Sequence, residues 1–377
     1  MNNLEEIQSF IVAKTKENAS RFEDKLPHAT DDGRYHFMED GFWVGGFWTG
    51  LTYLSYELSG DRSFLSAADR FKHRFIKRLY QDRHTTDHDL GFLFSLSFVA
   101  DYKLTGNKQS RQVGLDAAAA LADRFNDKGK FIQAWNVWTP GDAFSEGNRG
   151  RIIIDCMYNL PLLFWASEET GDPRYREIAI AQADTCLGTI VRPDYTTYHT
   201  YLFNPETGEP IGGRTFQGYA DDSCWSRGQS WAIGGYAHAY RYTGDVKYLE
   251  AAKSCAKVYI DRLEEDLVPK WDFHFHGYEN DEPRDTSAAA ITAASLLEIA
   301  KHVPQEERAY YSDLAERIVE NLYQFYSTKD EPEHEGLLKE ATAHKPKNSG
   351  INVSLIYGDY YFAEAVARLA NRTVIYW

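Results

Sequence analysis

The feature that most constrains the fold is a short pattern that recurs four times along the chain. Each copy has Ser or Thr, then Gly, then Asp or Asn, followed by a charged amphipathic run that contains Ala. Gly ends a helix because it tolerates a left-handed backbone, and Asp or Asn caps the next helix. The pattern therefore predicts a repeated helical hairpin. The copies are LSGDRSFLSAADRF, LTGNKQSRQVGLDAA, ETGDPRYREIAIAQA and YTGDVKYLEAAKSCA.

Hydrophobic periodicity extends the hairpin to the whole chain. Helices that are apolar nearly all round alternate with helices that have one charged face, and the first kind is expected inside the second. Six inner and six outer helices predict an all-α fold, an (α/α)6 barrel of six hairpins in a closed ring, with one domain over residues 1–377. The expected helices are 3–22, 43–59, 61–80, 89–105, 107–126, 151–170, 172–191, 225–243, 245–263, 285–302, 305–326 and 358–371.

The connections between these helices are unequal in length. Turns from an inner to an outer helix are mostly two or three residues, whereas several connections back inward are long. The long connections must all lie on one face, beside the N-terminal ends of the inner helices. Loops on a rigid scaffold often carry function, and helix N-termini favour anions. This face is the expected mouth of the site. The long connections are 127–150, 192–224, 264–284 and 327–357.

Composition narrows the possible partners. The formal net charge is −15 at pH 7, which disfavours nucleic acid but does not exclude a small anionic substrate. No apolar run approaches the length of about 18 residues that a membrane span needs, and the first residues lack a signal-peptide pattern. Four scattered cysteines indicate free thiols and a cytoplasmic location. They are Cys156, Cys186, Cys224 and Cys255.

One carboxylate interrupts an apolar stretch. Asp155 follows three isoleucines in RIIIDCMYNLPLLFWA, in the first turn of an expected inner helix. A buried, unpaired carboxylate is costly, so Asp155 either caps the helix or acts as a catalytic acid beside a cavity. Its apolar neighbours and the lack of an obvious cap favour catalysis. Asp89 in HDLGFLFSLS has the same position, Asp285 in PRDTSAAA is expected to be an N-cap, and Asp359 is open between the two roles.

Aromatic and polar residues lie near the same helix starts. Sugar-binding clefts use aromatic faces, although a single tryptophan is more often part of a core. Arg227 lies in an apolar, Trp-rich helix start and needs an anionic partner, either an aspartate or a substrate carboxylate. Together these residues are typical of a carbohydrate site. They are Trp43, Trp48, Trp135, His199, Trp225, Arg227, Gln229 and Trp231.

Six motifs, in the same order, resemble those of the unsaturated glucuronyl hydrolases, glycoside hydrolase family 88. The similarity extends from about residue 20 to the C-terminus. It implies an (α/α)6 barrel that acts on oligosaccharides left by polysaccharide lyases, which carry a 4,5-unsaturated uronic acid at the non-reducing end. The motifs are DHDLGFLFSLS, FIQAW, RGRIIIDCMYNLPLLFWASEETGDPRYR, CWSRGQSWAI, RDTSAAAITAASLLEIA and GDYYFAEA.

The resemblance also implies a reaction. In this family an aspartate protonates C4 of the unsaturated sugar and helps to activate the water that attacks C5. The resulting hemiketal opens and releases the remaining sugar. The motif match implies that Asp155 is this general acid and base and that Asp89 assists by holding sugar hydroxyls. The residues implied to contact substrate are Trp43, Trp135, His199, Gln217, Trp225, Arg227 and Trp231.

Two departures from the family pattern leave the preferred penultimate sugar, linkage and sulfation open. Phe216 in RTFQG stands where a His or a basic residue is expected. The segment ATAHKPKNSGI, which includes residues 343–350, lacks a Ser-x-x-Ser-x-Lys-like pattern associated with sulfated fragments, although Lys345 and Lys347 remain candidates for meeting a sulfate.

Three other interpretations remain. One is an unsaturated rhamnogalacturonyl hydrolase, which shares the fold but fits the motifs less well. Another is an ordinary inverting (α/α)6 glycosidase that uses Asp89 and Asp155 on saturated glycans. The third is a helical-repeat binding scaffold without catalysis. We expect a monomer or weak homodimer that binds a small unsaturated oligosaccharide, with no cofactor and no metal, because the HFH at 274–276 has no supporting ligand cluster.

Overall fold

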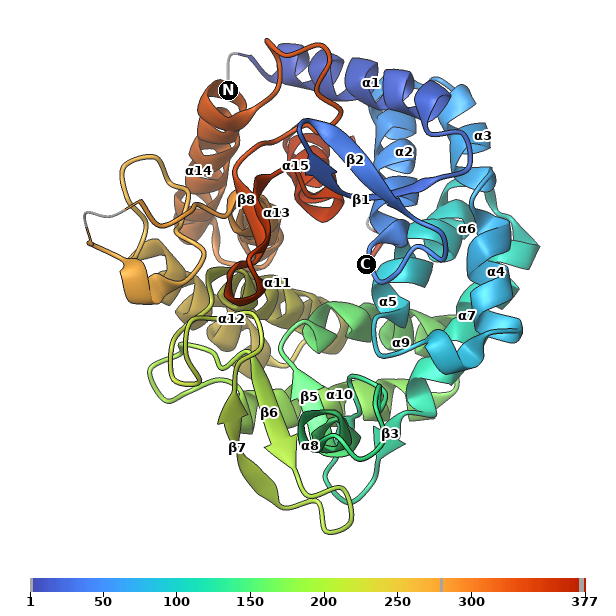
Figure 1. Ribbon diagram of the computed structural model, residues 1–377, viewed down its shortest axis with the longest axis vertical. Coiled ribbons are helices and arrows are strands. Elements are labelled where there is room, and N and C mark those ends of the chain that lie inside the picture. The colour runs from blue at the N-terminus through green and yellow to red at the C-terminus, as the bar shows by residue number, and fades with distance from the viewer. Residues whose placement is uncertain (1–2, 279–280, 373–375) are drawn as a thin grey trace.

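The computed structural model describes residues 3–278, 281–372 and 376–377 and is predominantly helical. Its inner helices contact one another in chain order, and the last of them, α15, also contacts the first, α2. Figure 1 shows these helices arranged around a common centre. The inner elements are α2 (Gly45–Ser59), α5 (Leu90–Phe94) continued through a π-helical turn by α6 (Ala100–Thr105), α9 (Cys156–Thr170), α11 (Ser226–Thr243), α13 (Thr286–His302) and α15 (Ile356–Leu369).

A second set of helices packs against the inner set from outside. Each inner element contacts the outer helix that follows it in the chain, and α15 contacts α1. The twelve expected helices are therefore all found within the described residues, although those expected at 61–80 and 89–105 are each divided. The outer elements are α1 (Leu4–Arg21), α3 (Ser63–Asp69) with α4 (Lys72–Tyr80), α7 (Lys108–Ala122), α10 (Pro173–Thr189), α12 (Val246–Ile260) and α14 (Gln305–Asn321).

The recurring sequence pattern forms the tight turns that it predicts. Its four glycines end inner helices with φ between 69° and 75°, a left-handed conformation that glycine adopts without a steric cost. Three of the residues that follow cap the next helix, because their side chains accept hydrogen bonds from backbone N–H groups of its first turn. The glycines are Gly60, Gly106, Gly171 and Gly244, and the capping residues are Asn107, Asp172 and Asp245.

The prediction of an all-α fold is wrong in detail, because short antiparallel strands occur in the connections. The helix expected at 151–170 begins only at Cys156, and residues 151–153 form a strand that pairs with residues 200–203. Isoleucine is β-branched and suits a strand, which explains the difference. The strands are β1 (Leu26–Asp31), β2 (Arg34–Met38), β3 (Phe125–Asn126), β4 (Phe131–Ile132), β5 (Arg151–Ile153), β6 (Thr200–Phe203), β7 (Pro210–Arg214), β8 (Ala341–His344) and β9 (Ser349–Val353).

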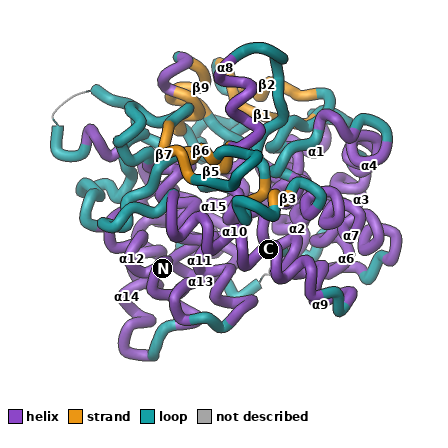
Figure 2. The backbone as a smooth tube through the Cα atoms, turned by 90° about the horizontal axis from the view of Figure 1, so that it is seen from below, coloured by secondary structure: helices purple, strands orange, loops and turns teal. Residues whose placement is uncertain are grey.

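The strands and long connections share one side of the molecule. Figure 2 shows them gathered over the helical layer, together with the short helix α8 (Ala143–Glu146). Because α9, α11, α13 and α15 each begin where such a connection ends, their N-terminal ends meet this side. The long connections thus lie on one face, as expected, and this face is called the mouth below.

The centre of the helical layer is filled by aromatic rings. Phe92 on α5, Trp231 on α11 and Tyr361 on α15 are at most 1% exposed, and Trp231 contacts both of the other rings. Trp377 stacks on Tyr361 with ring centroids 6.0 Å apart. The centre of the helical layer is therefore a packed aromatic core. Among the described residues, no helix combines the length and apolar character needed to cross a bilayer.

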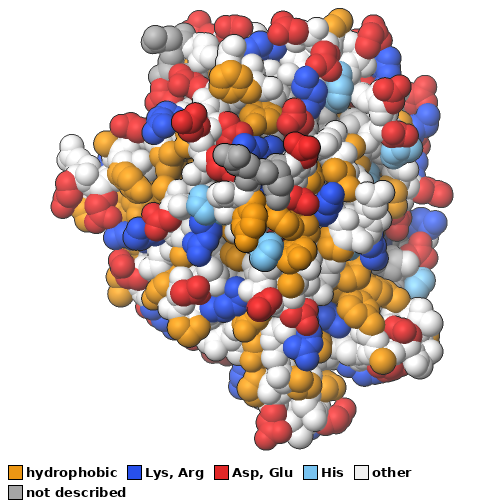
Figure 3. Space-filling view, turned by 60° about the vertical axis from the view of Figure 1, so that its left-hand side comes forward, with side chains coloured by type: hydrophobic (Ala, Val, Ile, Leu, Met, Phe, Trp, Pro, Cys, Tyr) orange, Lys and Arg blue, Asp and Glu red, His pale blue; other side chains and the backbone are white. Residues whose placement is uncertain are grey.

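Charges of both signs alternate on the surface. Figure 3 shows acidic and basic side chains interspersed on one face, with hydrophobic side chains between them. Although the chain has a net charge of −15, this face carries no extended region of a single sign. It therefore offers no broad basic surface of the kind that binds a polyanion.

Candidate active site

Asp89 and Asp155 lie at the mouth, at the starts of α5 and α9. His88 lies between them, with its Nε2 atom 3.5 Å from Oδ1 of each aspartate. The side chains of Asp89 and Asp155 are 7% and 17% exposed, whereas that of His88 is 1% exposed. One ligand-type atom from each of the three residues lies within 4.8 Å of the others. The sequence therefore brings two carboxylates and an imidazole into one nearly closed space.

A close approach of two helices sets this spacing. Asn159 on α9 donates through Nδ2 to Oδ1 of Asp89 at 3.4 Å and to the main-chain oxygen of Asp155 at 3.3 Å. Its Oδ1 accepts a hydrogen bond from the backbone N–H of Phe92 at 2.9 Å. A Cβ atom on Gly91 would lie 2.4 Å from Cα of Asn159, so only glycine allows this contact. Asn159 thus connects both carboxylates to one helix pair.

The interpretation of Asp155 and Asp89 as helix caps is wrong. Both occupy the position before a helix, yet neither side chain accepts a capping hydrogen bond from that helix. Asp285, by contrast, accepts a bond from the N–H of Ser287 at 3.1 Å and is the N-cap that the sequence predicted. Asp359 lies inside α15, where it accepts a hydrogen bond from the Tyr35 hydroxyl at 2.6 Å. Asp89 and Asp155, which make no capping hydrogen bond, are the two carboxylates at the mouth.

Burial shifts the protonation of the cluster. Burial, followed by the negative charge of Asp87, raises the pKa of Asp155 to about 7, and Arg227 acts in the opposite direction. Burial, helped by the charges of Asp87 and Asp155, raises the pKa of Asp89 well above its ordinary value. Burial lowers the pKa of His88 to about 4, so its imidazole is neutral at neutral pH. A proton is therefore available on the aspartate pair at neutral pH.

His199 is presented beside Asp155 by the sheet. The backbone N–H of Ile154 donates to the oxygen of His199 at 3.1 Å, which extends the pairing of β5 and β6. Nδ1 of His199 accepts hydrogen bonds from the backbone N–H groups of Phe216 at 2.9 Å and Gln217 at 3.0 Å. The ring proton must then be on Nε2, which is buried and has no partner within the described residues. His199 is thus a fixed neutral donor without an acceptor.

Arg227 takes an aspartate as its partner. It is 1% exposed and pairs with Asp285, and it also donates to the main-chain oxygens of Thr342 and Ala343, each at 2.7 Å. Its guanidinium centre lies 4.4 Å from the Trp225 ring. Of the two partners that the sequence left open, the structure provides the carboxylate of Asp285. A direct contact of Arg227 with substrate stays a prediction.

The other expected contact residues lie at different depths. Trp225 is buried against His199 with ring centroids 4.6 Å apart, and Gln217 donates to the oxygen of Ala343 at 2.9 Å. These two residues therefore belong to one network with His199 and Arg227. Trp43 and Trp135 are half-buried, whereas Trp48, Gln229 and Trp231 are buried in the core.

His88 and Asn159 are residues of the site that were not predicted from the sequence. His88 stands between Asp87 and Asp89, and this run of three polar residues before an apolar helix was a usable signal. Asn159 follows Asp155 by four residues, which places both on one side of a helix inside an otherwise apolar run. The His88–Asp89–Asp155 cluster also has metal-ligand chemistry, but carboxylates that hold a proton at neutral pH bind metals less well. The absence of a metal stays a prediction.

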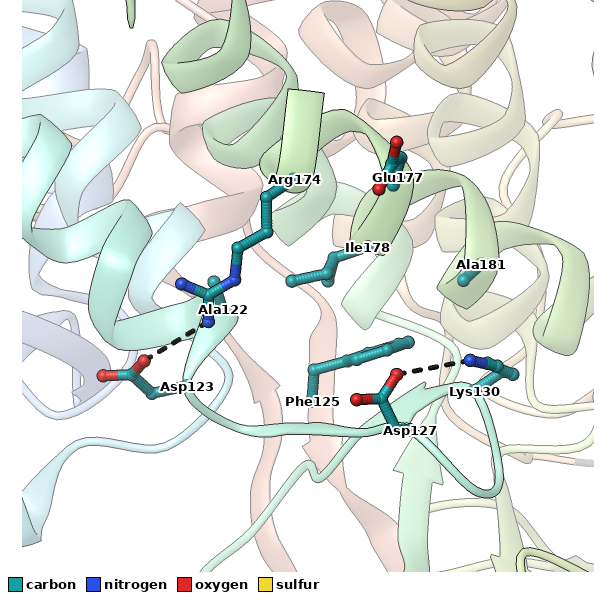
Figure 4. Close-up of a pocket in the computed structure, with 9 residues that line it drawn as sticks. All are labelled: Ala122, Asp123, Phe125, Asp127, Lys130, Arg174, Glu177, Ile178 and Ala181. Carbon is teal, nitrogen blue, oxygen red and sulfur yellow. Dashed lines mark hydrogen bonds and ion pairs between the residues drawn. The ribbon is translucent and has the colours of Figure 1, made fainter. Parts of the chain in front are cut away.

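A separate pocket lies on the outer side, between α7 and α10. Figure 4 shows Phe125 in it beside two ion pairs. Arg174 lies 3.7 Å from Asp123, and Lys130 lies 3.2 Å from Asp127. Its basic groups therefore have acidic partners within the pocket, and none of its lining residues belongs to the mouth cluster.

Substituting Arg227 tests its structural role. Arg227→Met should lower the free energy of unfolding by about 3–5 kcal/mol, because it leaves the Asp285 carboxylate buried without its partner. Urea denaturation followed by circular dichroism measures this. Lys257→Met is the matched control, since the Lys257–Asp261 pair is exposed and should contribute little. Equal effects of the two substitutions would contradict the structural role of Arg227.

Comparison with known proteins finds relatives that match nearly the whole chain. The model of Glycosyl Hydrolase Family 88 matches residues 11–364. The chain is 40% identical to the unsaturated glucuronyl hydrolase of Bacillus sp. strain GL1. The 366 aligned residues cover 96% of each chain. The crystal structure of an unsaturated glucuronyl hydrolase from Bacillus sp. GL1, described as responsible for the degradation of glycosaminoglycan, is 40% identical with a TM-score of 0.92, covering 97% of this chain and 96% of that one.

A second solved structure holds a sugar ligand. It is an aspartate-to-asparagine variant of an unsaturated glucuronyl hydrolase with dGlcA-Glc-Rha-Glc, similar at a TM-score of 0.90 and 40% identity over 96% of both chains. The matched family model and these similarities cover nearly the whole chain. The chain belongs to glycosyl hydrolase family 88, and it is a glycoside hydrolase.

Proposed function

We propose that this protein removes the 4,5-unsaturated uronic acid from the non-reducing end of lyase-generated oligosaccharides, such as glycosaminoglycan fragments, by hydrating the vinyl ether. The fold that we infer for this is a single (α/α)6-barrel domain over residues 1–377. The observation that carries the proposal is the pair of carboxylates at the mouth, Asp89 buried and Asp155 17% exposed, of which Asp155 has a pKa of about 7. The resemblance of the relatives and the ligand of one of them support the substrate class.

Asp155 is the proposed acid and base. A general acid needs a proton at working pH, and a pKa near 7 provides one. Asp155 gives that proton to C4, the double bond shifts its electrons toward C4, and positive charge develops at C5 and the ring oxygen. The carboxylate left behind then accepts a proton from the water that adds to C5. The hemiketal formed at C5 opens, and the remaining sugar leaves from C1.

Asp89 and His88 are proposed to assist. Asp89 holds sugar hydroxyls, and Asn159 orients it through the 3.4 Å hydrogen bond. His88 keeps the two carboxylates apart without adding a positive charge, because its pKa of about 4 leaves it neutral. A positive charge there would stabilise the carboxylates and lower the pKa of Asp155. One oxygen of each carboxylate lies within 4.8 Å of an oxygen of the other.

Substrate binding is proposed to use the connected network at the mouth. The free Nε2–H of His199 donates to a sugar oxygen, since a buried donor without a partner is costly. Trp43, Trp135 and Trp225 provide aromatic faces, and Gln217 provides an amide. Arg227 acts on the substrate carboxylate through the positive charge that it adds near Asp155, and Trp231 supports the floor of the site from the core.

Hydration makes a specific isotopic prediction. With an unsaturated disaccharide in D₂O, the ultraviolet absorbance of the C4=C5 bond should disappear and deuterium should appear at C4 of the released uronic acid, because the proton on Asp155 exchanges with solvent. Mass spectrometry and nuclear magnetic resonance of the product measure the label. Delivery by Asp155 should label one of the two hydrogen positions at C4 in the early product. An ordinary glycosidase would instead release a sugar whose ring-opened enol takes up deuterium at either position, and a binding scaffold would leave the absorbance unchanged.

Asp155→Asn separates catalysis from helix capping. Asn is nearly isosteric but cannot transfer the proton, so kcat should fall about 10²–10⁴-fold or more while the protein still folds. The control is Asp172→Asn, because Asp172 caps α10 and Asn caps equally well. Initial rates and thermal melting measure both variants. An Asp155→Asn enzyme as active as the control would reject the proposed role.

The pH profile tests the raised pKa of Asp155. The acid works only while protonated, so kcat/KM should decrease as pH rises through about 7. Asp87→Asn removes a negative charge that raises this pKa and should therefore move the alkaline limb to lower pH, while its amide oxygen can still accept the N–H of Asp89. Rates from pH 5 to 9 with one disaccharide decide this. A limb that does not respond to Asp87→Asn would argue against Asp155 as its origin.

A further inference from the structure

Four aromatic side chains form a group beside the catalytic cluster, which we call the aromatic rim: Trp135, Trp138, Phe144 and Phe216. Ring centroids of Trp135 and Trp138 are 5.0 Å apart, and those of Trp135 and Phe216 are 5.1 Å apart. Phe144 lies 5.5 Å from Phe216 and stacks on Trp138 at 6.0 Å. The rim combines residues from three separate parts of the mouth: the loop after β4, the helix α8 and the turn after β7.

The two outer rings of the rim are exposed. Trp138 is 52% exposed and Phe144 is 38% exposed, whereas Trp135 and Phe216 are half-buried behind them. Arg151 covers part of the inner side, with its guanidinium centre 4.4 Å from the Phe144 ring, and the Lys347 ammonium lies 4.2 Å from the Phe216 ring. An exposed cluster of large aromatic rings leaves apolar area in water, so it indicates a ligand surface. Trp138 and Phe144 are its most exposed rings.

Hydrogen bonds hold the rim in place. The Asn136 amide donates to the oxygens of Thr86 at 2.8 Å and His84 at 3.1 Å, and Asn148 donates to the oxygen of Asn136 at 2.9 Å. Ser145 Oγ accepts the N–H of Thr139 at 2.8 Å. The surface is therefore preorganised, which reduces the entropy lost when a ligand binds.

The rim borders the catalytic residues directly. The backbone N–H of His88 donates to the oxygen of Ala134 at 3.1 Å, one residue before Trp135. On the other side, the backbone N–H of Phe216 donates to Nδ1 of His199. Each of the two histidines of the site is therefore connected to the rim by a backbone hydrogen bond. His88 bonds to the residue before Trp135, and His199 bonds to Phe216.

We propose that the aromatic rim binds the leaving part of the substrate, the second and third sugars beyond the unsaturated residue, by packing them against the exposed sides of Trp138 and Phe144. This rests on the proposed function. The protein would then prefer unsaturated tetrasaccharides over disaccharides, because a disaccharide ends before these rings. Binding energy from the remote sugars lowers the barrier of the same hydration step at Asp155.

The test compares two substrates made by one lyase from one unsulfated glucuronic-acid polysaccharide, the unsaturated disaccharide and the unsaturated tetrasaccharide. For the unaltered protein, kcat/KM should be about tenfold higher for the tetrasaccharide. Trp138→Ala and Phe144→Ala should each remove most of this preference and leave the disaccharide rate within about twofold. Tyr310→Ala is the matched control, because Tyr310 is 56% exposed on α14 and is not part of the rim.

The outcomes distinguish the rim from the function on which it rests. Equal kcat/KM for both substrates in the unaltered protein, or equal losses on both in the rim variants, would overturn the rim while leaving hydration intact. Turnover of neither substrate would reject the proposed function itself. Calorimetric titration of Asp155→Asn with each oligosaccharide adds a measurement that is independent of turnover. Tighter binding of the tetrasaccharide, lost on adding Trp138→Ala, is the expected result, and equal binding would contradict the rim.

Discussion

The absence of a side chain at Gly91 allows α5 and α9 to approach so closely that Asn159 reaches the first helix. Through this contact the two aspartates, which begin different helices, come to share one space with His88. Burial makes ionisation of either carboxylate costly, and the negative charge of Asp87 adds to that cost. The availability of a proton at neutral pH is therefore a consequence of helix packing, and the chemistry depends on the backbone contact between Gly91 and Asn159.

The alternation of short and long connections provides the rest of the site. Tight glycine turns fix one end of the hairpins, and the opposite end is free to carry strands and loops of different lengths. The sheet of β5, β6 and β7 brings His199 next to Asp155, while Asp285 and the β8 strand immobilise Arg227. The scaffold and the specificity elements are thus separated: helices determine where the acids lie, and connections determine what surrounds them.

Much of this arrangement could be predicted from local sequence. The hairpin pattern, the twelve helices and the face that carries the long connections depend on periodicity and capping, which are local properties, and Asp155 stands out because its neighbours are apolar. What could not be predicted depends on contacts between distant segments. The choice of Asp285 over a ligand as the partner of Arg227, the pairing of residues 151–153 with 200–203, and the assembly of Trp138 and Phe144 with Phe216 have no periodic signal in the sequence.

The contact between α15 and α2 has a consequence for how this chain folds. These helices lie near opposite ends of the sequence, yet each buries part of its apolar surface against the other. During synthesis, α2 is made long before α15. The surface of α2 that α15 covers in the folded protein therefore stays exposed while the intervening hairpins are made. Contacts of such long sequence separation slow folding and prolong the exposure of apolar surface. The contact between the first and last inner helices therefore needs nearly the whole chain, and the apolar surface of α2 that it covers stays exposed until then.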